Sequence, residues 1–296
     1  MKKLLNLMLV LSLSLAFCAC SPQTSETNQQ GGANSVTLIE NKGSDTIVNL
    51  ALAWAEYYQK LDPAVNISVT GGGTGTGIAA LINGTADIAN ASRKITQDEI
   101  VDAQKNGVEP YEIIIAHDAI AIIVNLENPV DQLTLQQISD IYSGKITNWK
   151  EVGGEDRPIV RLSRETNSGT HVYFLETVLR MGDKDSKLLF DPHTLLLASS
   201  EGITTEVRDN PNAIGYDGLG YVTPDVKVLR VARSAEDQFV LPSAETVNQA
   251  TYPISRDLYV YTNGKPTGVL KVYLDWILSD EAQQIVLQTG FVPVTD

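Results

Sequence analysis

Patterns typical of β-strands alternate with helical patterns along most of this chain. Short apolar runs at residues 36–40 and 65–70 predict strands. Residues 47–61 and 75–83 place apolar side chains at helical spacing, which predicts amphipathic helices. Strands that alternate with helices favour a mostly parallel sheet with helices packed on its faces. The sequence therefore predicts an α/β fold.

Two later strand-like runs predict that the chain forms two lobes. Residues 119–125 and 252–262 are the segments at which we expect the chain to cross between the lobes. A chain that leaves a lobe and returns to it is held by two strands, which form a hinge beside a cleft. An apolar run at 113–124 contains His117 and Asp118, and we expect these two residues to interrupt it. The predicted division is lobe one at residues 36–118 and 256–296, and lobe two at residues 119–255.

The first residues carry the pattern of a secretory signal peptide. A basic pair at residues 2–3 precedes an apolar run at 4–17, so residues 1–19 are predicted to be the signal peptide. Bacterial lipoproteins are cleaved immediately before a cysteine that then carries lipid, and small residues are preferred in front of it. Ala19 precedes Cys20, which makes Cys20 the predicted lipidation site. Secretion with ordinary cleavage nearby is the alternative.

A polar segment follows the predicted lipidation site. Residues 20–35 have no apolar periodicity and are rich in Ser, Thr, Gln, Asn and Gly. That composition predicts a flexible tether that holds the folded part away from a membrane. Since both cysteines of the chain lie at residues 18 and 20, the folded part has none from which to form a disulfide.

The chain is strongly acidic. It has 22 Lys and Arg residues against 36 Asp and Glu residues, which gives a formal charge of −14. A nucleic-acid partner is not expected, because such a partner needs clustered Lys and Arg to neutralise its phosphates. The electrostatic field of this negative charge also repels small anions at long range. An anion could therefore be bound only through local hydrogen-bond donors and dipoles.

Four clusters of glycine and hydroxyl residues each lie between a predicted strand and a helix. They occupy residues 43–46, 71–77, 90–93 and 164–170. Glycines let a backbone approach a ligand closely, the first N–H groups of a helix lack internal partners, and hydroxyls add donors. Clusters that converge on a cleft would form a donor-rich oxyanion site, to which Arg93 and Arg164 add positive charge. The alternative for each cluster is an ordinary helix cap.

Other chemistries have little support in the sequence. Residues 75–80 give only a weak variant of the dinucleotide fingerprint, and the chain has no Walker A motif. The histidines, His117, His171 and His193, are not closely spaced, and the predicted folded part has no thiol. We therefore expect no metal, no cofactor and no catalytic residue. An enzyme, such as a secreted phosphatase, is the less favoured alternative.

Six stretches of the chain follow one another in an order typical of a known family. They are KGSDTIVNLALAWAEYY, GGGTGTGIAALINGTADIANASR, LTLQQISDIYSGKITNWKEVGG, SRETNSGTH, IGYDGLGYV and YLDWILSDEAQQIVLQTGFVPV. Over residues 41–294 the chain resembles the phosphate-binding lipoproteins that serve bacterial high-affinity phosphate ABC importers. The resemblance implies a two-lobed periplasmic-binding-protein fold of type II that closes on one phosphate. It also implies docking onto a membrane permease, and no catalysis.

The resemblance also implies which residues hold phosphate. Those of lobe one are Ser44, Asp45, Thr46, Thr74, Gly75, Ser92 and Arg93. Those of lobe two are Arg164, Ser168, Gly169 and Thr170. Arg164 is expected to provide the main charge pairing. Ser168 and Thr170 are expected to donate through their hydroxyls, beside backbone N–H groups.

Two positions depart from well-known members of this family. Those members carry an aspartate where this chain has Ser92, and the aspartate accepts the proton of hydrogen phosphate, which sulfate lacks. They also carry an acid two residues after the arginine, where this chain has Thr166. We hypothesise that Asp45 takes over the acceptor role. The alternative is that Asp45 is only the N-cap of the helix at 47–61.

The sequence as a whole thus predicts a binding protein rather than an enzyme. The expected protein is a monomer in the cell envelope, lipid-anchored on the extracytoplasmic side of the membrane. It would capture inorganic phosphate and deliver it to the permease subunits of an ABC importer. A receptor for another oxyanion, such as sulfate or molybdate, is one alternative. A surface phosphate sensor or adhesin without a transport role is another.

Overall fold

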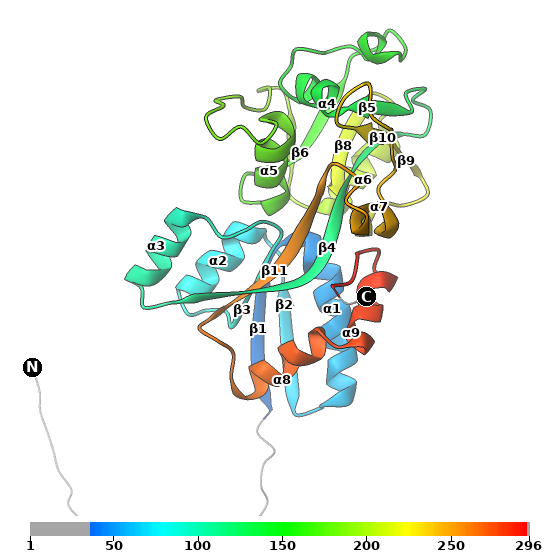
Figure 1. Ribbon diagram of the computed structural model, residues 1–296. Coiled ribbons are helices and arrows are strands. Elements are labelled where there is room, and N and C mark those ends of the chain that lie inside the picture. The colour runs from blue at the N-terminus through cyan, green and yellow to red at the C-terminus, as the bar shows by residue number, and fades with distance from the viewer. Residues whose placement is uncertain (1–35, 295–296) are drawn as a thin grey trace, which may run out of the picture. The chain divides into compact units, whose positions relative to one another are not determined.

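The computed structural model describes residues 36–294. The predicted signal peptide, the predicted tether and Cys20 lie outside the described residues. Figure 1 shows two α/β bodies joined by the long strands β4 (Pro110–Asn125) and β11 (Ser255–Asn263). We call the body around strands β1 (Thr37–Gly43), β2 (Val65–Thr70) and β3 (Ile88–Ala91) lobe one. The body around strands β6 (Val160–Arg164), β7 (Leu195–Leu197) and β8 (Ala213–Gly218) is lobe two. The predicted two-lobed α/β fold is confirmed.

Lobe one is built on three parallel strands in the order β2-β1-β3. These strands are β1 (Thr37–Gly43), β2 (Val65–Thr70) and β3 (Ile88–Ala91). Helices α1 (Asp45–Leu61), α8 (Gly268–Ile277) and α9 (Asp280–Gln288) share one hydrophobic core against the sheet. Helices α2 (Thr74–Ile82) and α3 (Gln97–Lys105) pack on the other face (Figure 1). The last segment of the chain therefore returns to the lobe in which the described part begins.

Lobe two has a parallel centre with antiparallel additions. Its strands are β5 (Gln132–Thr134), β6 (Val160–Arg164), β7 (Leu195–Leu197), β8 (Ala213–Gly218), β9 (Val226–Val228) and β10 (Arg230–Ala232). Its α-helices are α4 (Leu135–Tyr142), α5 (Gly169–Phe174), α6 (Ser200–Asp209) and α7 (Ala244–Asn248). A π-helical turn at Leu175–Leu179 continues α5, and 3₁₀ turns occupy Trp149–Val152 and Leu219–Tyr221. Strand β6 pairs in parallel with β7 and β8, while β5 and β10 form a separate parallel pair.

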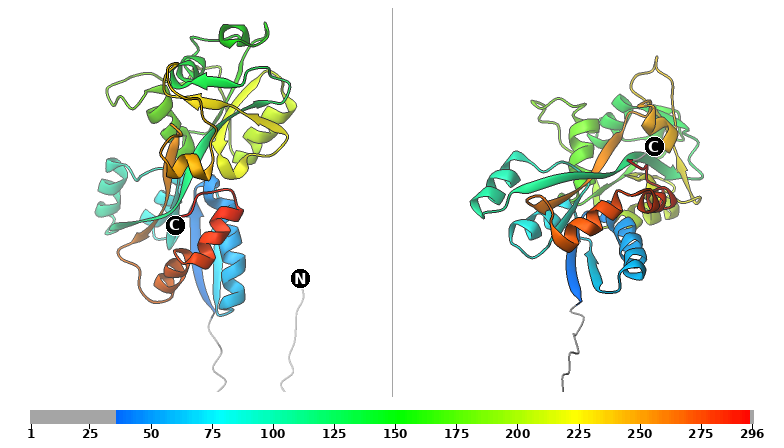
Figure 2. Two further views of the ribbon diagram at one scale, coloured as in Figure 1. Left: turned by 45° about the vertical axis from the view of Figure 1, so that its right-hand side comes forward. Right: turned by 60° about the horizontal axis from the view of Figure 1, so that its bottom comes forward.

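Strand β4 belongs to both lobes. Its first part, from Pro110 to Ala119, pairs with β11, and its second part, from Ile120 onward, pairs with β8 and β9. One nine-stranded sheet therefore runs through the molecule, in the order β2-β1-β3-β11-β4-β8-β6-β7, with β9 paired to β4. The left view in Figure 2 shows strand β4, in green, continuing from one lobe into the other.

The predicted elements agree with the structure except in one case. The predicted strand at 65–70 is β2, and the strand and helices predicted at 36–40, 47–61 and 75–83 are β1, α1 and α2 with ends shifted by up to three residues. The expected interruption of the run at 113–124 is wrong, because β4 is continuous through His117 and Asp118. Both polar side chains have partners on β11: Asp257 for His117 and Arg256 for Asp118. An unpaired polar side chain inside the sheet would cost free energy and disfavour the strand. Because both side chains have partners, that cost is avoided and the strand continues.

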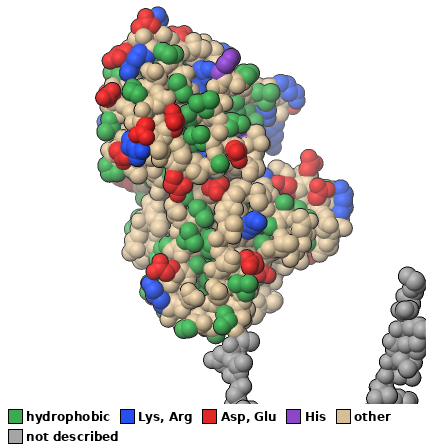
Figure 3. Space-filling model, turned by 180° about the vertical axis from the view of Figure 1, so that it is seen from behind, with side chains coloured by type: hydrophobic (Ala, Val, Ile, Leu, Met, Phe, Trp, Pro, Cys, Tyr) green, Lys and Arg blue, Asp and Glu red, His purple; other side chains and the backbone are tan. Residues whose placement is uncertain are grey.

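The surface shows charges of both signs. Figure 3 shows Asp and Glu side chains scattered among Lys and Arg over the face seen there, without one extended basic patch. That pattern agrees with the acidic composition. No helix within residues 36–294 has both the length and the apolar character needed to cross a membrane.

Candidate anion-binding site between the lobes

The glycine and hydroxyl clusters of the two lobes meet at the lobe boundary. The hydroxyl oxygens of Thr46 in α1 and Thr170 in α5 lie 2.8 Å apart, within hydrogen-bond distance. The N–H of Gly75 in α2 donates to the carbonyl of Asn167 at 3.1 Å. Each contact joins residues of different lobes that are more than 90 positions apart in the sequence. The structure thus brings the first, second and fourth predicted clusters together.

The third cluster enters the same contact through Ser92. The backbone N–H of Ser92 donates to the Thr74 hydroxyl at 3.0 Å, and the two hydroxyl oxygens lie 3.3 Å apart. A Cβ added to Gly169 would stand 2.4 Å from the Thr74 hydroxyl and 2.5 Å from that of Ser92. Only glycine fits at position 169, because any side chain would force the lobes apart. Lobe two therefore presents bare backbone to two hydroxyls of lobe one.

The side chains at this contact are buried and polar. Seven of the predicted residues are no more than 3% exposed: Ser44, Thr46, Thr74, Ser92, Arg164, Ser168 and Thr170. A buried hydroxyl that lacks a partner costs about 1–3 kcal/mol, so such a cluster is tolerated only if its groups bond to each other or to a ligand.

The helices that start at this contact lack side-chain caps. The N-cap residues of α1, α2 and α5 are Ser44, Gly73 and Ser168, and none of them makes a side-chain cap bond. Helices α3 and α4, which begin elsewhere, have complete capping boxes at Thr96 and Thr134. Uncapped N–H groups at the start of a helix favour an anion, and the helix dipole adds to that preference.

Arg164 makes an ion pair between the lobes. Its Nη2 lies 2.8 Å from the Oδ2 of Asp45, whose Oδ1 accepts the N–H of Gly72 at 2.9 Å. The guanidinium also donates to the hydroxyl of Ser200 and to the carbonyl of Ala198, both at 2.8 Å. The arginine that was expected to pair with the anion is thus held in a fixed position by lobe two and by the first turn of α1.

The structure also decides the alternative role for Asp45. The N-cap of α1 is Ser44, and Asp45 is the first residue of the helix. The interpretation of Asp45 as the N-cap is therefore wrong. Its carboxylate accepts from a lobe-two arginine and from a glycine of the second cluster, so it lies within the lobe contact.

A second carboxylate lies behind Arg164. The Ser200 hydroxyl, which accepts from Arg164, donates to the Oδ1 of Asp217 at 2.8 Å. Asp217 is fully buried, and within residues 36–294 its Oδ2 has no hydrogen-bond partner. Burial raises the pKa of Asp217 to about 7, although the positive charge of Arg164 opposes that shift.

The sequence analysis missed a buried ion pair at the same contact. Arg256 in β11 donates through Nε and Nη2 to the Oδ2 of Asp118 in β4, at 3.2 and 2.9 Å. Its Nη2 also reaches the hydroxyl of Thr170 at 3.0 Å. Burial raises the pKa of Asp118, and Arg256 opposes that shift. The signal in the sequence is a single acid within the apolar run at 113–124 and a single arginine in the predicted crossing segment at 252–262.

Arg93 is not part of this cluster in the structure. Its guanidinium forms two hydrogen bonds with the carboxylate of Glu99 in α3, at 2.8 and 2.7 Å. Burial raises the pKa of Glu99, but the bonds from Arg93 and from Thr96 lower it further than burial raises it. Arg93 therefore faces the start of α3, while Ser92, its neighbour, faces the lobe contact.

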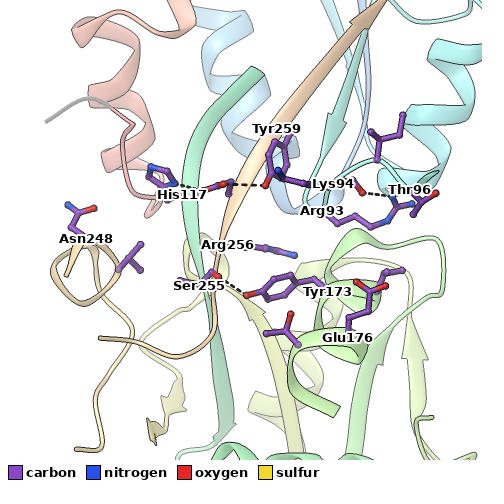
Figure 4. Close-up of a pocket in the computed structure, with 15 residues that line it drawn as sticks. Arg93, Lys94, Thr96, His117, Tyr173, Glu176, Asn248, Ser255, Arg256 and Tyr259 are labelled. Carbon is purple, nitrogen blue, oxygen red and sulfur yellow. Dashed lines mark hydrogen bonds and ion pairs between the residues drawn. The ribbon is translucent and has the colours of Figure 1, made fainter. Parts of the chain in front are cut away.

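A groove beside β11 borders the site. It has a volume of about 750 Å³ and is lined by both lobes, including Arg93 and Thr96 on one side and Tyr173 and Glu176 on the other. Figure 4 shows the Arg256 side chain extending from β11 into this region, close to Tyr173. The hydroxyl of Tyr173 donates to the carbonyl of Ser255 at 2.6 Å, which ties α5 to the hinge strand.

The arrangement suits binding of an oxyanion. It combines hydroxyls and uncapped N–H groups from two lobes with two arginines, and it is buried from water. Within residues 36–294, no group of three or more His, Cys, Asp or Glu side chains gathers in a way that could hold a metal ion.

Comparison with known proteins identifies the family. The model of the PBP superfamily domain matches residues 23–281. The phosphate-binding protein PstS of Pseudomonas aeruginosa is 34% identical, and the match covers 94% of this chain and 89% of that protein. The phosphate-binding protein PstS of Bacillus subtilis is 29% identical over 99% of this chain and 95% of that protein.

Solved structures agree with the sequence relatives. A protein of Clostridium perfringens, crystallised with phosphate and described as a phosphate ABC transporter substrate-binding protein, superimposes with a TM-score of 0.77. It is 34% identical, and the match covers 88% of this chain and all of that one. An ABC-type phosphate transport receptor of Vibrio cholerae gives a TM-score of 0.68 at 30% identity, over 86% of this chain and 99% of that one. The chain therefore belongs to the PBP superfamily and, within it, to the family of the phosphate-binding proteins named PstS.

Proposed function

We propose that the protein captures inorganic phosphate between its lobes and delivers it to the permease of an ABC importer. The observation that carries this proposal is the buried meeting of Thr46 and Thr74 of lobe one with Gly169 and Thr170 of lobe two, beside Arg164. Relatives named phosphate-binding protein PstS and a phosphate-bound transport protein of the same fold support the choice of ligand.

Binding would replace contacts that the lobes now make with each other. The hydroxyls of Thr46 and Thr170, 2.8 Å apart, would donate to phosphate instead. Buried donors on a preformed scaffold bind an anion strongly, since little side-chain freedom is lost and water is excluded. The acidic surface repels the ion at long range, so the affinity comes from short-range dipoles and hydrogen bonds.

The proposed phosphate ligands come from both lobes. They are Ser44, Thr46, Thr74, Gly75, Ser92, Ser168, Gly169 and Thr170, with Arg164 for charge pairing. Arg93 is bonded to the carboxylate of Glu99 and would contact phosphate only if that ion pair broke. We therefore do not propose Arg93 as a direct phosphate ligand.

Asp45 is the proposed acceptor for the proton of hydrogen phosphate. Its position favours this role, because its carboxylate lies against Arg164 and against Gly72 of the second cluster. A carboxylate at an oxyanion site repels sulfate, which has no proton to donate at neutral pH, and accepts a bond from hydrogen phosphate. Phosphate would thus be preferred through rejection of its competitor.

The protein is proposed to act without catalysis, as a monomer on the outer side of a membrane. A lipid on Cys20 would hold it there, and residues 20–35 would give it reach toward the permease. The relatives are named as binding and transport proteins, which supports this role over that of an enzyme.

Titration calorimetry of the purified protein tests the proposal directly. Phosphate is expected to bind with a stoichiometry of one, and neither sulfate nor molybdate should displace it. Preferential binding of sulfate or molybdate would show that the protein is a receptor for that oxyanion and not for phosphate. Absence of binding to all three would contradict the proposed function. Phosphate binding without stimulation of uptake by a reconstituted importer would favour a sensor or adhesin.

A further inference from the structure

One guanidinium touches the hinge and both lobes. Arg256 stands opposite Asp118 in the antiparallel pairing of β11 with β4, and its side chain is almost completely buried. Its Nη1 donates to the carbonyl of Ser92 in lobe one at 2.9 Å. Its Nη2 reaches the hydroxyl of Thr170 in lobe two at 3.0 Å and that of Thr46 in lobe one at 3.4 Å.

We propose that Arg256 is a positioning residue of the site, which orients the hydroxyls of Thr46 and Thr170 as donors toward bound phosphate. This inference rests on the proposed function, because it describes how two of the proposed phosphate ligands are prepared for an anion. Neither the family resemblance nor the glycine and hydroxyl clusters of the sequence pointed to this residue.

The chemistry follows from the one-sided nature of the guanidinium. Arginine has five N–H donors and no acceptor, so any hydroxyl bonded to it must accept. A hydroxyl has one hydrogen and two lone pairs. One N–H of Nη2 bonds to Asp118, so its other N–H is shared between the oxygens of Thr46 and Thr170. When each oxygen accepts from that N–H, the hydrogen of the hydroxyl points away from the guanidinium. Of the two hydrogens on Thr46 and Thr170, one can serve the contact between these residues, and phosphate can accept both once it separates them.

Arg256 is itself held in place on several sides. Asp118 accepts both Nε and Nη2 through Oδ2, while its Oδ1 accepts the N–H of Leu219 at 3.1 Å. The guanidinium carbon lies 5.5 Å from the centre of the Tyr173 ring, at cation–π distance. The plane and direction of the Arg256 guanidinium are therefore fixed before a ligand binds. Its N–H donors need no reorganisation when the anion arrives.

The same fixation limits what Arg256 contributes as a charge. Asp118 is fully buried and directly paired with it, so the pair is neutral as a whole. Long-range attraction of phosphate is accordingly left to other groups. The contribution of Arg256 is local, through the direction of two hydroxyls and the position of the Ser92 carbonyl.

A neutral pair of substitutions separates positioning from stability. Arg256→Gln alone strands the buried Asp118 carboxylate and should lower both stability and phosphate affinity. The double variant Arg256→Gln/Asp118→Asn removes both charges, so its thermal stability should recover. Its phosphate affinity should stay roughly 10- to 100-fold below that of the wild type, because the two hydroxyls lose their orienting donor. Wild-type affinity in the stable double variant would overturn the inference.

A second measurement covers the case in which these variants do not fold. Arg256→Lys keeps a positive donor, so the protein should fold and bind phosphate with intermediate affinity. If Arg256 acts through the hydroxyls, the effect of Arg256→Lys should become smaller in a Thr46→Val/Thr170→Val background. Equal effects in both backgrounds would overturn the inference. Arg230→Gln, an exposed arginine in β10, is the control for charge and should bind phosphate normally.

These outcomes are distinct from failure of the proposed function. If the wild-type protein releases no heat with phosphate, the proposed function fails and Arg256 has no anion to serve. If the wild type binds phosphate and the stable double variant binds equally well, only the role of Arg256 fails.

Discussion

The guanidinium of Arg164 in lobe two lies 2.8 Å from the carboxylate of Asp45 in lobe one. The two residues are 119 positions apart in the sequence, and one ends a strand while the other begins a helix. The cation proposed to meet phosphate is therefore already paired with the anion proposed to accept the phosphate proton. Substitutions at the two positions should have different effects on the choice between oxyanions.

Arg164→Ala should weaken phosphate binding by two orders of magnitude or more. Loss of a charged hydrogen-bond partner in a buried site costs about 1.5–3 kcal/mol, which is roughly a 10- to 150-fold loss of affinity. The repulsion between the anion and the Asp45 carboxylate, which is left unpaired beside it, adds to that loss. Calorimetric titration measures the effect, with Arg230→Ala as the control at an exposed position. Wild-type affinity in Arg164→Ala would remove this residue from the site.

Asp45→Asn should reduce discrimination rather than abolish binding. The amide keeps the shape of the side chain and removes the negative charge that repels sulfate. We expect phosphate affinity to fall roughly tenfold and sulfate to become a measurable competitor. Asp225→Asn, at a turn where the carboxylate is 47% exposed and pairs with Arg208, provides the matched control. If both phosphate affinity and sulfate rejection stay unchanged, Asp45 is not the acceptor.

Gly169→Ala should keep the lobes from approaching fully. The new methyl group would stand 2.4 Å from the hydroxyl of Thr74, a distance that requires the lobes to separate. Phosphate affinity should drop, and small-angle scattering with saturating phosphate should show a larger radius of gyration than the wild type. Gly202→Ala in α6, where the nearest neighbour of an added Cβ is 3.2 Å away, serves as the control. Unaltered affinity and dimensions would show that the contact is not part of the bound state.

Asp217→Asn should change the pH dependence of stability. The folded-state pKa of Asp217 is about 7, well above its ordinary value of 3.8, so the folded protein holds a proton that the unfolded chain releases. Stability from this group is present at low pH and is lost as the pH rises from about 4 to about 7. The variant stays neutral, so urea unfolding should show a smaller loss of stability between about pH 5 and about pH 8, by roughly 3 kcal/mol at most. Parallel profiles for variant and wild type would contradict this assignment.

Cys20→Ser should release the protein from the membrane. Without the acceptor cysteine no lipid can be attached, and a single protein domain without that anchor has little membrane affinity. Fractionation of cells that express the variant should move the protein from the membrane pellet to the soluble extracytoplasmic fraction. Cys18→Ser is the matched control and should remain with the membrane. Equal membrane binding by both variants would contradict lipidation at Cys20.

Local patterns predicted the elements that carry the site. The spacing of apolar residues was sufficient for α1, α2 and β2, because each buries one face against the sheet of lobe one. The glycine and hydroxyl clusters were recognisable because uncapped helix starts and close backbone contacts need those residue types. Gly169 is the clearest case, since the structure leaves no room for a side chain there.

Pairings between distant residues were beyond the reach of these patterns. His117 and Asp118 suggested a break in a strand, because nothing nearby in the sequence could compensate a buried charge. Their partners lie on β11, about 140 positions later, and become visible only through the register of the two strands. Arg93 shows the opposite case, in which a neighbouring acid, Glu99, holds a candidate ligand away from the site.

The continuity of β4 has a mechanical consequence. A loop hinge swings freely, but this strand is hydrogen-bonded to β11 below Ala119 and to β8 and β9 above it. Opening by bending would therefore strain this ladder, and the shift of register between Leu258 and Tyr259 is the one irregularity in its pairing with β11. The sheet should thus return the two lobes to one preferred separation after each movement. Relaxation of the sheet toward that separation would assist release of the proposed ligand.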